Sequence, residues 1–124
     1  MSALLRAYSL SLPGAVEEFP WGERVVKVDK KVFVFMGMAD APEAGVSLSL
    51  KLPISREEAL ETGFGKPTGY GLGKSGWVSL RYEPGDRPGL DQLCRWVEES
   101  YRAVAKKKRV GELDAARALS PKAR

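Results

Sequence analysis

Residues 71–76 read Gly-Leu-Gly-Lys-Ser-Gly and have the spacing G-x-G-x-x-G, which is typical of loops that bind nucleotide phosphates. A dinucleotide site of this type follows a strand and opens a helix, so that backbone N–H groups and the helix dipole meet the pyrophosphate. Here the pattern predicts a strand directly after the glycines, over residues 77–82. The residue five positions before Gly73 is Thr68, where a phosphate-binding P-loop has glycine. We therefore interpret the segment as a hairpin loop whose glycines supply positive φ angles.

The chain contains no histidine and a single cysteine, Cys94. Ser-His-Asp and Cys-His catalysis, intramolecular disulfides and metal sites built from His or Cys are therefore excluded. Cys94 lies on the apolar stripe of a predicted helix, where a thiol packs as a small hydrophobic group and stays protonated. Solvated faces and helix caps explain the carboxylates, and no D-x-D-x-D-G spacing offers a calcium loop. Because no catalytic machinery is visible, we expect a protein that is not an enzyme and holds no cofactor or metal.

Basic and aromatic side chains on two predicted strands are better candidates for chemistry. Apolar residues alternate with polar, basic or aromatic ones along residues 46–52 and 77–82. The outward side chains of the two segments are Ser47, Ser49, Lys51, Trp77, Ser79 and Arg81. Such a face suits a polyanion, because Lys and Arg neutralise phosphates, hydroxyls donate to them, and an aromatic ring stacks on a base. The alternative is an ordinary solvated sheet face whose Trp77 is covered by a helix.

Further cations extend this candidate surface toward a hairpin, the glycine-rich loop and the C-terminus. Residues 102–124 carry 8 basic and 2 acidic side chains, whereas residues 1–101 carry 12 and 14. The run 106–109 either complements the negative end of a helix dipole or contacts phosphates. In the second case Arg102, Arg117, Lys122 and Arg124 join it. The β-branched and aromatic residues of 24–28 and 31–36, on either side of Asp29-Lys30, predict a hairpin, and Lys30 and Lys31 lie around its turn. The candidate nucleic-acid-binding residues are Lys27, Lys51, Lys74, Trp77, Arg81, Lys106, Lys107 and Lys108.

Hydrophobic periodicity predicts the elements that position these side chains. The expected elements are a helix over 2–10, strands over 24–28, 31–36, 46–52 and 77–82, a short helix ending near Gly63, and a long amphipathic helix over 89–109. Ser55 and Glu58 have the spacing of a capping box for the short helix. In the second strand Phe33 and Phe35 face one way and the valines the other, so this strand is predicted to be central. Gly111 closes the long helix, and at most a weak turn follows.

Short motifs occur in a recognisable order along residues 8–106. They are Leu12-Pro13-Gly14, Glu17-Glu18, Pro20-Trp21-Gly22, Val26-Lys27-Val28, Lys31-Val32-Phe33, Ser47 to Leu52, the run from Gly71 to Val78, and Glu99-Ser100-Tyr101. In these motifs the chain resembles the MmcQ/YjbR-like family. The resemblance implies an α+β sheet flanked by helices, in a CyaY-like arrangement described as a double-wing DNA-binding motif. It also implies Lys51, Lys74 and Trp77 as surface candidates, and residues 20–22 as a shaped turn.

At 124 residues the chain has the size of one domain. We expect a single α+β domain over residues 1–110, with a mostly antiparallel sheet flanked by helices in the order helix, three strands, helix, strand, helix. A weakly structured basic tail is expected over 111–124. The leading hypothesis is a DNA-binding module that contacts DNA electrostatically. The alternatives are a protein-interaction or adaptor domain, including a homodimer, and a small-molecule binder that uses a cleft beneath the glycine-rich loop and Trp21.

The longest apolar run, residues 32–36, is too short for a membrane helix, and no signal-peptide pattern opens the chain. We therefore expect a soluble, cytoplasmic protein with no membrane partner. The sequence has no asparagine and one glutamine beside 29% charged residues, a composition that favours a heat-adapted source.

Overall fold

The computed structural model describes residues 2–20, 23–38, 46–68, 75–83, 86 and 89–118. The helices in these residues are α1 (Ser2–Leu10), α2 (Arg56–Glu61), α3 (Leu90–Val104) and α4 (Lys107–Ala118). The strands are β1 (Val16–Glu18), β2 (Glu23–Val28), β3 (Lys31–Met38), β4 (Val46–Lys51), β5 (Gly65–Pro67) and β6 (Trp77–Tyr82). The predicted α+β class is confirmed. The two short strands β1 and β5 and the last helix α4 add to the predicted order of elements.

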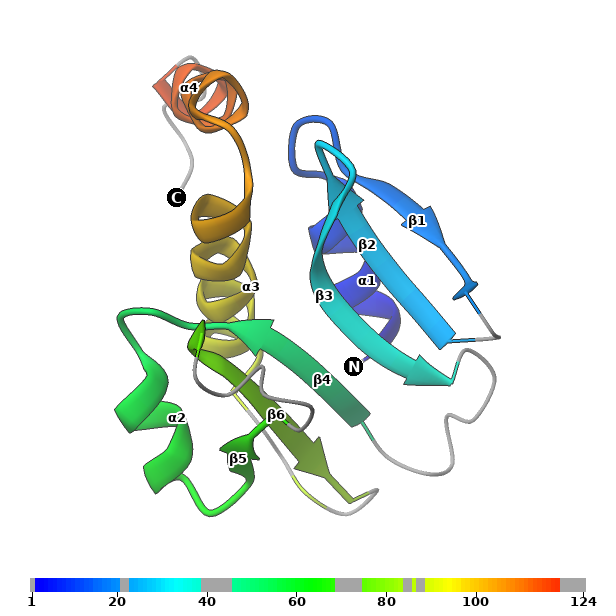
Figure 1. Cartoon of the computed structure of the whole chain (residues 1–124), viewed down its shortest axis with the longest axis vertical. Coiled ribbons are helices and arrows are strands. Elements are labelled where there is room, and N and C mark those ends of the chain that lie inside the picture. The colour runs from blue at the N-terminus through cyan, green and yellow to red at the C-terminus, as the bar shows by residue number, and fades with distance from the viewer. Residues whose placement is uncertain are drawn as a thin grey trace.

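The strands form one antiparallel sheet in the order β1-β2-β3-β4-β6-β5 (Figure 1). Helix α3 packs against α1, β3 and β4, and α2 packs against β5 and β6. The strand residues Leu50 and Val78 are fully buried in the same core cluster as Ala59 of α2 and Tyr101 of α3. We call this helix-covered side of the sheet the inner face and the opposite side the outer face.

Strand β3 contains a bulge that changes the predicted side-chain directions. Val26 of β2 pairs with Val34, and the next residue of β2, Lys27, pairs with Val32, so Phe33 is an extra residue in β3. Phe33 therefore turns to the inner face, where its ring meets the Tyr101 ring edge-on at 5.3 Å. The expectation that Phe33 and Phe35 share one side is wrong, because the bulge interrupts the alternation.

Strands β3 and β4 pair at only two positions, Val34 with Leu50 and Phe35 with Ser49. Next to these pairs the fully buried Ser100 of α3 connects the two strands. Its hydroxyl donates to the Phe33 carbonyl at 2.6 Å and accepts from the Lys51 amide at 2.9 Å. The sheet thus consists of two three-stranded halves, β1-β2-β3 and β4-β6-β5, which diverge in Figure 1.

The predicted hairpin between β2 and β3 is confirmed and turns through Asp29 and Lys30. Both residues have positive φ angles, 53° and 70°, as a type I′ hairpin turn requires. The Asp29 carboxylate accepts from the Lys106 amide at 3.0 Å and from Arg109 Nε at 3.3 Å. The turn therefore supplies negative charge at the start of α4, whose own first turn has no acidic residue.

The predicted long helix over 89–109 is two helices. Helix α3 ends at Val104, Ala105 is extended with ψ 152°, and α4 then continues to Ala118. Gly111 lies inside α4, and the residues expected to form a weak turn are helical. Leu113 is buried against the core and anchors α4. The apolar periodicity continues into Ala105 and conceals the break, at which the Asp29 carboxylate accepts from the Lys106 amide.

The predicted capping box at α2 is also wrong. Ser55 makes no side-chain hydrogen bond to the start of α2 and donates its hydroxyl to Glu99 Oε1 of α3 at 2.7 Å. The backbone amides of Ile54 and Ser55 both donate to Glu99 Oε2, at 2.8 and 2.9 Å. A carboxylate from α3 thus holds the start of α2.

Among the described residues, no helix is long and apolar enough to cross a membrane.

Candidate nucleic-acid interface

Strands β4 and β6 bring the predicted polar side chains together on the outer face. Their register places Ser47 opposite Arg81, Ser49 opposite Ser79 and Lys51 opposite Trp77. Strand β5 adds Lys66, which lies opposite Ser79. The alternation expected for both predicted strands is confirmed, since Leu50 and Val78 point to the inner face. We define the outer patch as Ser47, Ser49, Lys51, Lys66, Ser79 and Arg81.

Three hydroxyl groups form a short chain in the middle of this patch. Ser79 Oγ lies 2.8 Å from Ser49 Oγ and 2.9 Å from Thr68 Oγ1, at hydrogen-bonding distance in both cases. Each hydroxyl has one proton, so two hydrogen bonds among three hydroxyls use two of the three protons. One O–H donor is therefore left for an external acceptor whichever way the chain is oriented. A phosphate oxygen is an acceptor of this kind.

The charge of the outer patch is positive. Strands β4, β5 and β6 contain no Asp or Glu. Lys51 and Lys66 have no ion-pair partner within the described part of the chain, and Arg81 Nε lies 3.3 Å from Glu83, which follows β6. Two lysines without a paired carboxylate beside a donor-rich row of hydroxyls create a local potential that attracts anions.

Trp77 does not contribute an open stacking surface. Its side chain is only 8% exposed, and its ring meets the Phe35 ring at 5.5 Å with an interplanar angle of 65°. The expected role of Trp77, stacking on a base, is therefore revised to packing on the outer face. Alternation correctly placed Trp77 on this face, but it could not show that Phe35 of β3 packs against the ring.

The sequence model of the YjbR family matches residues 10–103. The chain belongs to the YjbR family. No curated protein matches it in a sequence search. The matched range includes the whole outer patch and ends within α3, so α4 lies beyond the part that defines this YjbR-family domain.

Arginines near the C-terminus of the YjbR-family chain are paired with carboxylates. Arg102 bonds Glu98 Oε2 and Asp114 Oδ1, both at 2.7 Å, and Arg117 bonds Glu98 Oε1 at 2.7 Å. Desolvation alone would raise the pKa of Glu98, but hydrogen bonds from both arginines lower that pKa below its usual value. The expectation that Arg102 and Arg117 contact phosphates is revised, because they attach α4 to α3.

Lysines 106–108 are exposed and lie at the beginning of α4. The segment was predicted to end a long helix, but it lies between the C-terminal end of α3 and the first turn of α4, whose N-terminal end is positive. The β2–β3 turn holds this segment through Asp29, and Figure 1 shows α4 at the end of the molecule away from β5 and β6. The three lysines are thus separate from the outer patch.

The other predicted site residues are divided between the two halves of the sheet. Lys27 pairs with Glu18 at 2.9 Å on the β1-β2-β3 half. Lys74, Trp21, Gly22, Lys122 and Arg124 lie outside the described residues, as does the cleft expected beneath the glycine-rich loop. Lys66 was missed, because β5 has only three residues within a glycine-rich stretch and shows too little alternation to predict a strand.

Cys94 is half-buried and packs against the core. Burial raises the pKa of its thiol, and the nearby Asp91 raises it further. A protonated thiol of this kind is a packing group, in agreement with the sequence-based interpretation.

Proposed function

We propose that this YjbR-family domain binds DNA through the outer patch. The observation that carries the proposal is the pair Lys51 and Lys66, which flank the hydroxyl chain on a sheet face whose strands contain no carboxylate. Lysine ammonium groups displace counterions from phosphates, and the spare hydroxyl proton donates to a phosphate oxygen.

This binding is expected to be electrostatic and largely independent of base sequence. The patch is made of cations and hydroxyl groups, which are the usual partners of phosphates. The aromatic ring on the same face is buried and does not reach bases. If Lys51, Lys66 and Arg81 each contact one phosphate, the plot of log affinity against log salt has a slope of about −3.

The experiment is a salt titration of the affinity for a labelled short duplex, measured by fluorescence polarisation. The variants are Lys51→Ala, Lys66→Ala and the double variant, with Arg95→Ala on α3 as a matched loss of an exposed cation away from the patch. Each lysine variant should reduce the magnitude of the slope by about 0.9, and the double variant should leave a slope of about −1. Arg95→Ala should leave the salt slope of the unsubstituted protein unchanged.

Two results would contradict this assignment. Absence of binding at low salt would reject DNA as the ligand. Binding that persists in the double lysine variant but disappears when residues 106–108 are changed to alanine would move the site to the start of α4. In that case the slope of the unsubstituted protein would come from the three lysines there, and the outer patch would have no role.

A further inference from the structure

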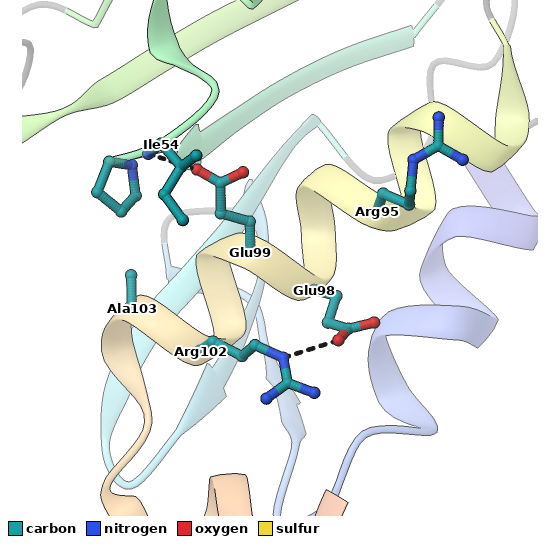
Figure 2. A pocket seen from close by; sticks show the side chains of 7 residues that line it. Ile54, Arg95, Glu98, Glu99, Arg102 and Ala103 are labelled. Carbon is teal, nitrogen blue, oxygen red and sulfur yellow. Dashed lines mark hydrogen bonds and ion pairs between the residues drawn. The ribbon is translucent and has the colours of Figure 1, made fainter. Parts of the chain in front are cut away.

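A pocket of about 480 Å³ lies between the segment that precedes α2 and the exposed side of α3 (Figure 2). Pro53, Ile54 and Ala103 form its apolar part, and charged side chains of α3 form the rest. None of these residues belongs to the outer patch. The volume lies within the range of about 300 to 1,000 Å³ that is usual for binding pockets.

The apolar part of the pocket is held in place by hydrogen bonds to α3. The side chain of Ile54 is 84% exposed, although its backbone amide is fixed by Glu99 Oε2 at 2.8 Å. The amide and hydroxyl of Ser55 also donate to the Glu99 carboxylate. Ile54 is therefore presented to solvent on a constrained backbone. A surface that is ordered before binding loses less conformational entropy when a partner arrives.

The charges around the pocket leave one cation without a partner. Arg95 has no hydrogen bond or ion pair within the described part of the chain, and Figure 2 shows its guanidinium directed away from Glu98 and Glu99. These glutamates occupy positions i+3 and i+4, on the same side of the helix as Arg95. Glu98 is instead bound by Arg102 and Arg117, and Glu99 holds the start of α2. Both glutamates have their oxygens occupied by donors, so within the described part of the chain Arg95 is the charged side chain of this pocket that has no hydrogen-bonding partner.

We propose that the pocket docks a segment of a partner protein that presents an aliphatic side chain next to an acidic one. The aliphatic group packs on Pro53, Ile54 and Ala103, and the carboxylate forms a bidentate ion pair with Arg95. An acidic side chain fits this site because it supplies the acceptor that the Arg95 guanidinium lacks among the described residues, while its apolar neighbour covers Ile54. The surface is distinct from the proposed DNA-binding patch, so the protein could hold both ligands at once.

The test selects short peptides that bind the purified full chain from a displayed library of random peptides. Enriched peptides are synthesised with a fluorophore and their affinities are measured by fluorescence polarisation. They should share a Leu, Ile, Val or Met within two positions of an Asp or Glu. Ile54→Asp should lower the affinity about tenfold or more, as expected for a central apolar contact. Val16→Asp, which changes another exposed aliphatic residue, is the matched control and should bind normally.

A charge exchange makes the test specific for Arg95. Arg95→Glu should weaken binding of the acidic peptides about tenfold and restore it for peptides whose acidic residue is replaced by lysine. Lys108→Glu, an equal change of charge on α4, should have no effect. All four substituted residues are exposed, so circular dichroism should show the same fold in the variants of Val16, Ile54, Arg95 and Lys108.

Three outcomes would overturn the proposal. They are a selection without enrichment, enriched peptides that lack the acidic residue, and enriched peptides whose affinity is unchanged in Ile54→Asp and Arg95→Glu. Sedimentation of the peptide-free protein provides a fourth. If the chain forms a dimer that Ile54→Asp dissociates, a second copy occupies the pocket and the partner proposal is wrong. DNA affinity is measured on the same variants. A failure of the docking proposal can then be distinguished from a failure of the DNA-binding proposal.

Discussion

Replacement of Ser100 by alanine should strongly destabilise the fold, because one hydroxyl connects the two halves of the sheet. Ser100 is fully buried and satisfies the Phe33 carbonyl on β3 and the Lys51 amide on β4. Strands β3 and β4 pair at only two positions, so this hydroxyl adds to a short contact. Its removal leaves one backbone acceptor and one backbone donor without this partner.

The expected cost follows from the two groups. An unsatisfied buried polar group costs about 1 to 3 kcal/mol, so the loss of a partner for two groups in Ser100→Ala should lower the free energy of unfolding by about 2 to 6 kcal/mol. A domain is stable by about 5 to 15 kcal/mol in total, so a loss of this size is large. The same change should loosen the junction between β3 and β4, where Lys51 begins the outer patch.

Ser9 of α1 offers a matched control for the assay, which is urea unfolding followed by circular dichroism. Ser9 is also fully buried, but its hydroxyl donates to the Leu5 carbonyl of the same helix at 2.8 Å. That carbonyl keeps its helical hydrogen bond when the hydroxyl is removed, so Ser9→Ala should cost less than about 1 kcal/mol. Equal losses in the two variants would refute the bridging role of Ser100.

Three further predictions concern the turn, the C-terminal ion pairs and the start of α2. Lys30→Gly should raise the free energy of unfolding by about 0.5 kcal/mol, because glycine accepts the φ of 70° without the strain of a side chain; a lower melting temperature would contradict this. The lowered pKa of Glu98 gives the folded state stability that is complete above the usual value of 4.5 and is lost as the pH falls below it. Glu98→Gln should therefore flatten the acid part of a stability-against-pH curve, and an unchanged curve would remove Glu98 as a contributor. Glu99→Ala should lower the free energy of unfolding in urea by about 1 to 3 kcal/mol, because three hydrogen bonds at the start of α2 are lost. A change smaller than the error of the measurement would show that water replaces the carboxylate.

The sequence predicts those elements whose side-chain pattern is local. Strict alternation in residues 46–52 and 77–82 correctly places Lys51 and Arg81 on one face, since each strand buries only its other side. The position of the type I′ turn could be predicted from the two strands that flank it, although Asp29 and Lys30 are not the usual glycine-containing pair. Lys66 escapes detection because β5 is too short to show a period.

Long-range contacts account for the features that the sequence does not predict. The bulge at Phe33 forms where α3 packs on β3, and no local pattern marks it. At the break after Val104, the Lys106 amide donates to Asp29, a residue 77 positions earlier in the chain. The start of α2 is held by Glu99 of α3. In each case an ordinary polar or aromatic residue acquires its role from a partner far along the chain.

The most direct test of the outer patch is a titration of the isotopically labelled protein with a short DNA duplex, followed by backbone amide shifts in NMR spectra. We expect the shifts to concentrate on β4, β5 and β6 around Lys51, Lys66 and Ser79, and to diminish as salt is added. Shifts confined to residues 106–108, or spectra unchanged at low salt, would contradict this expectation.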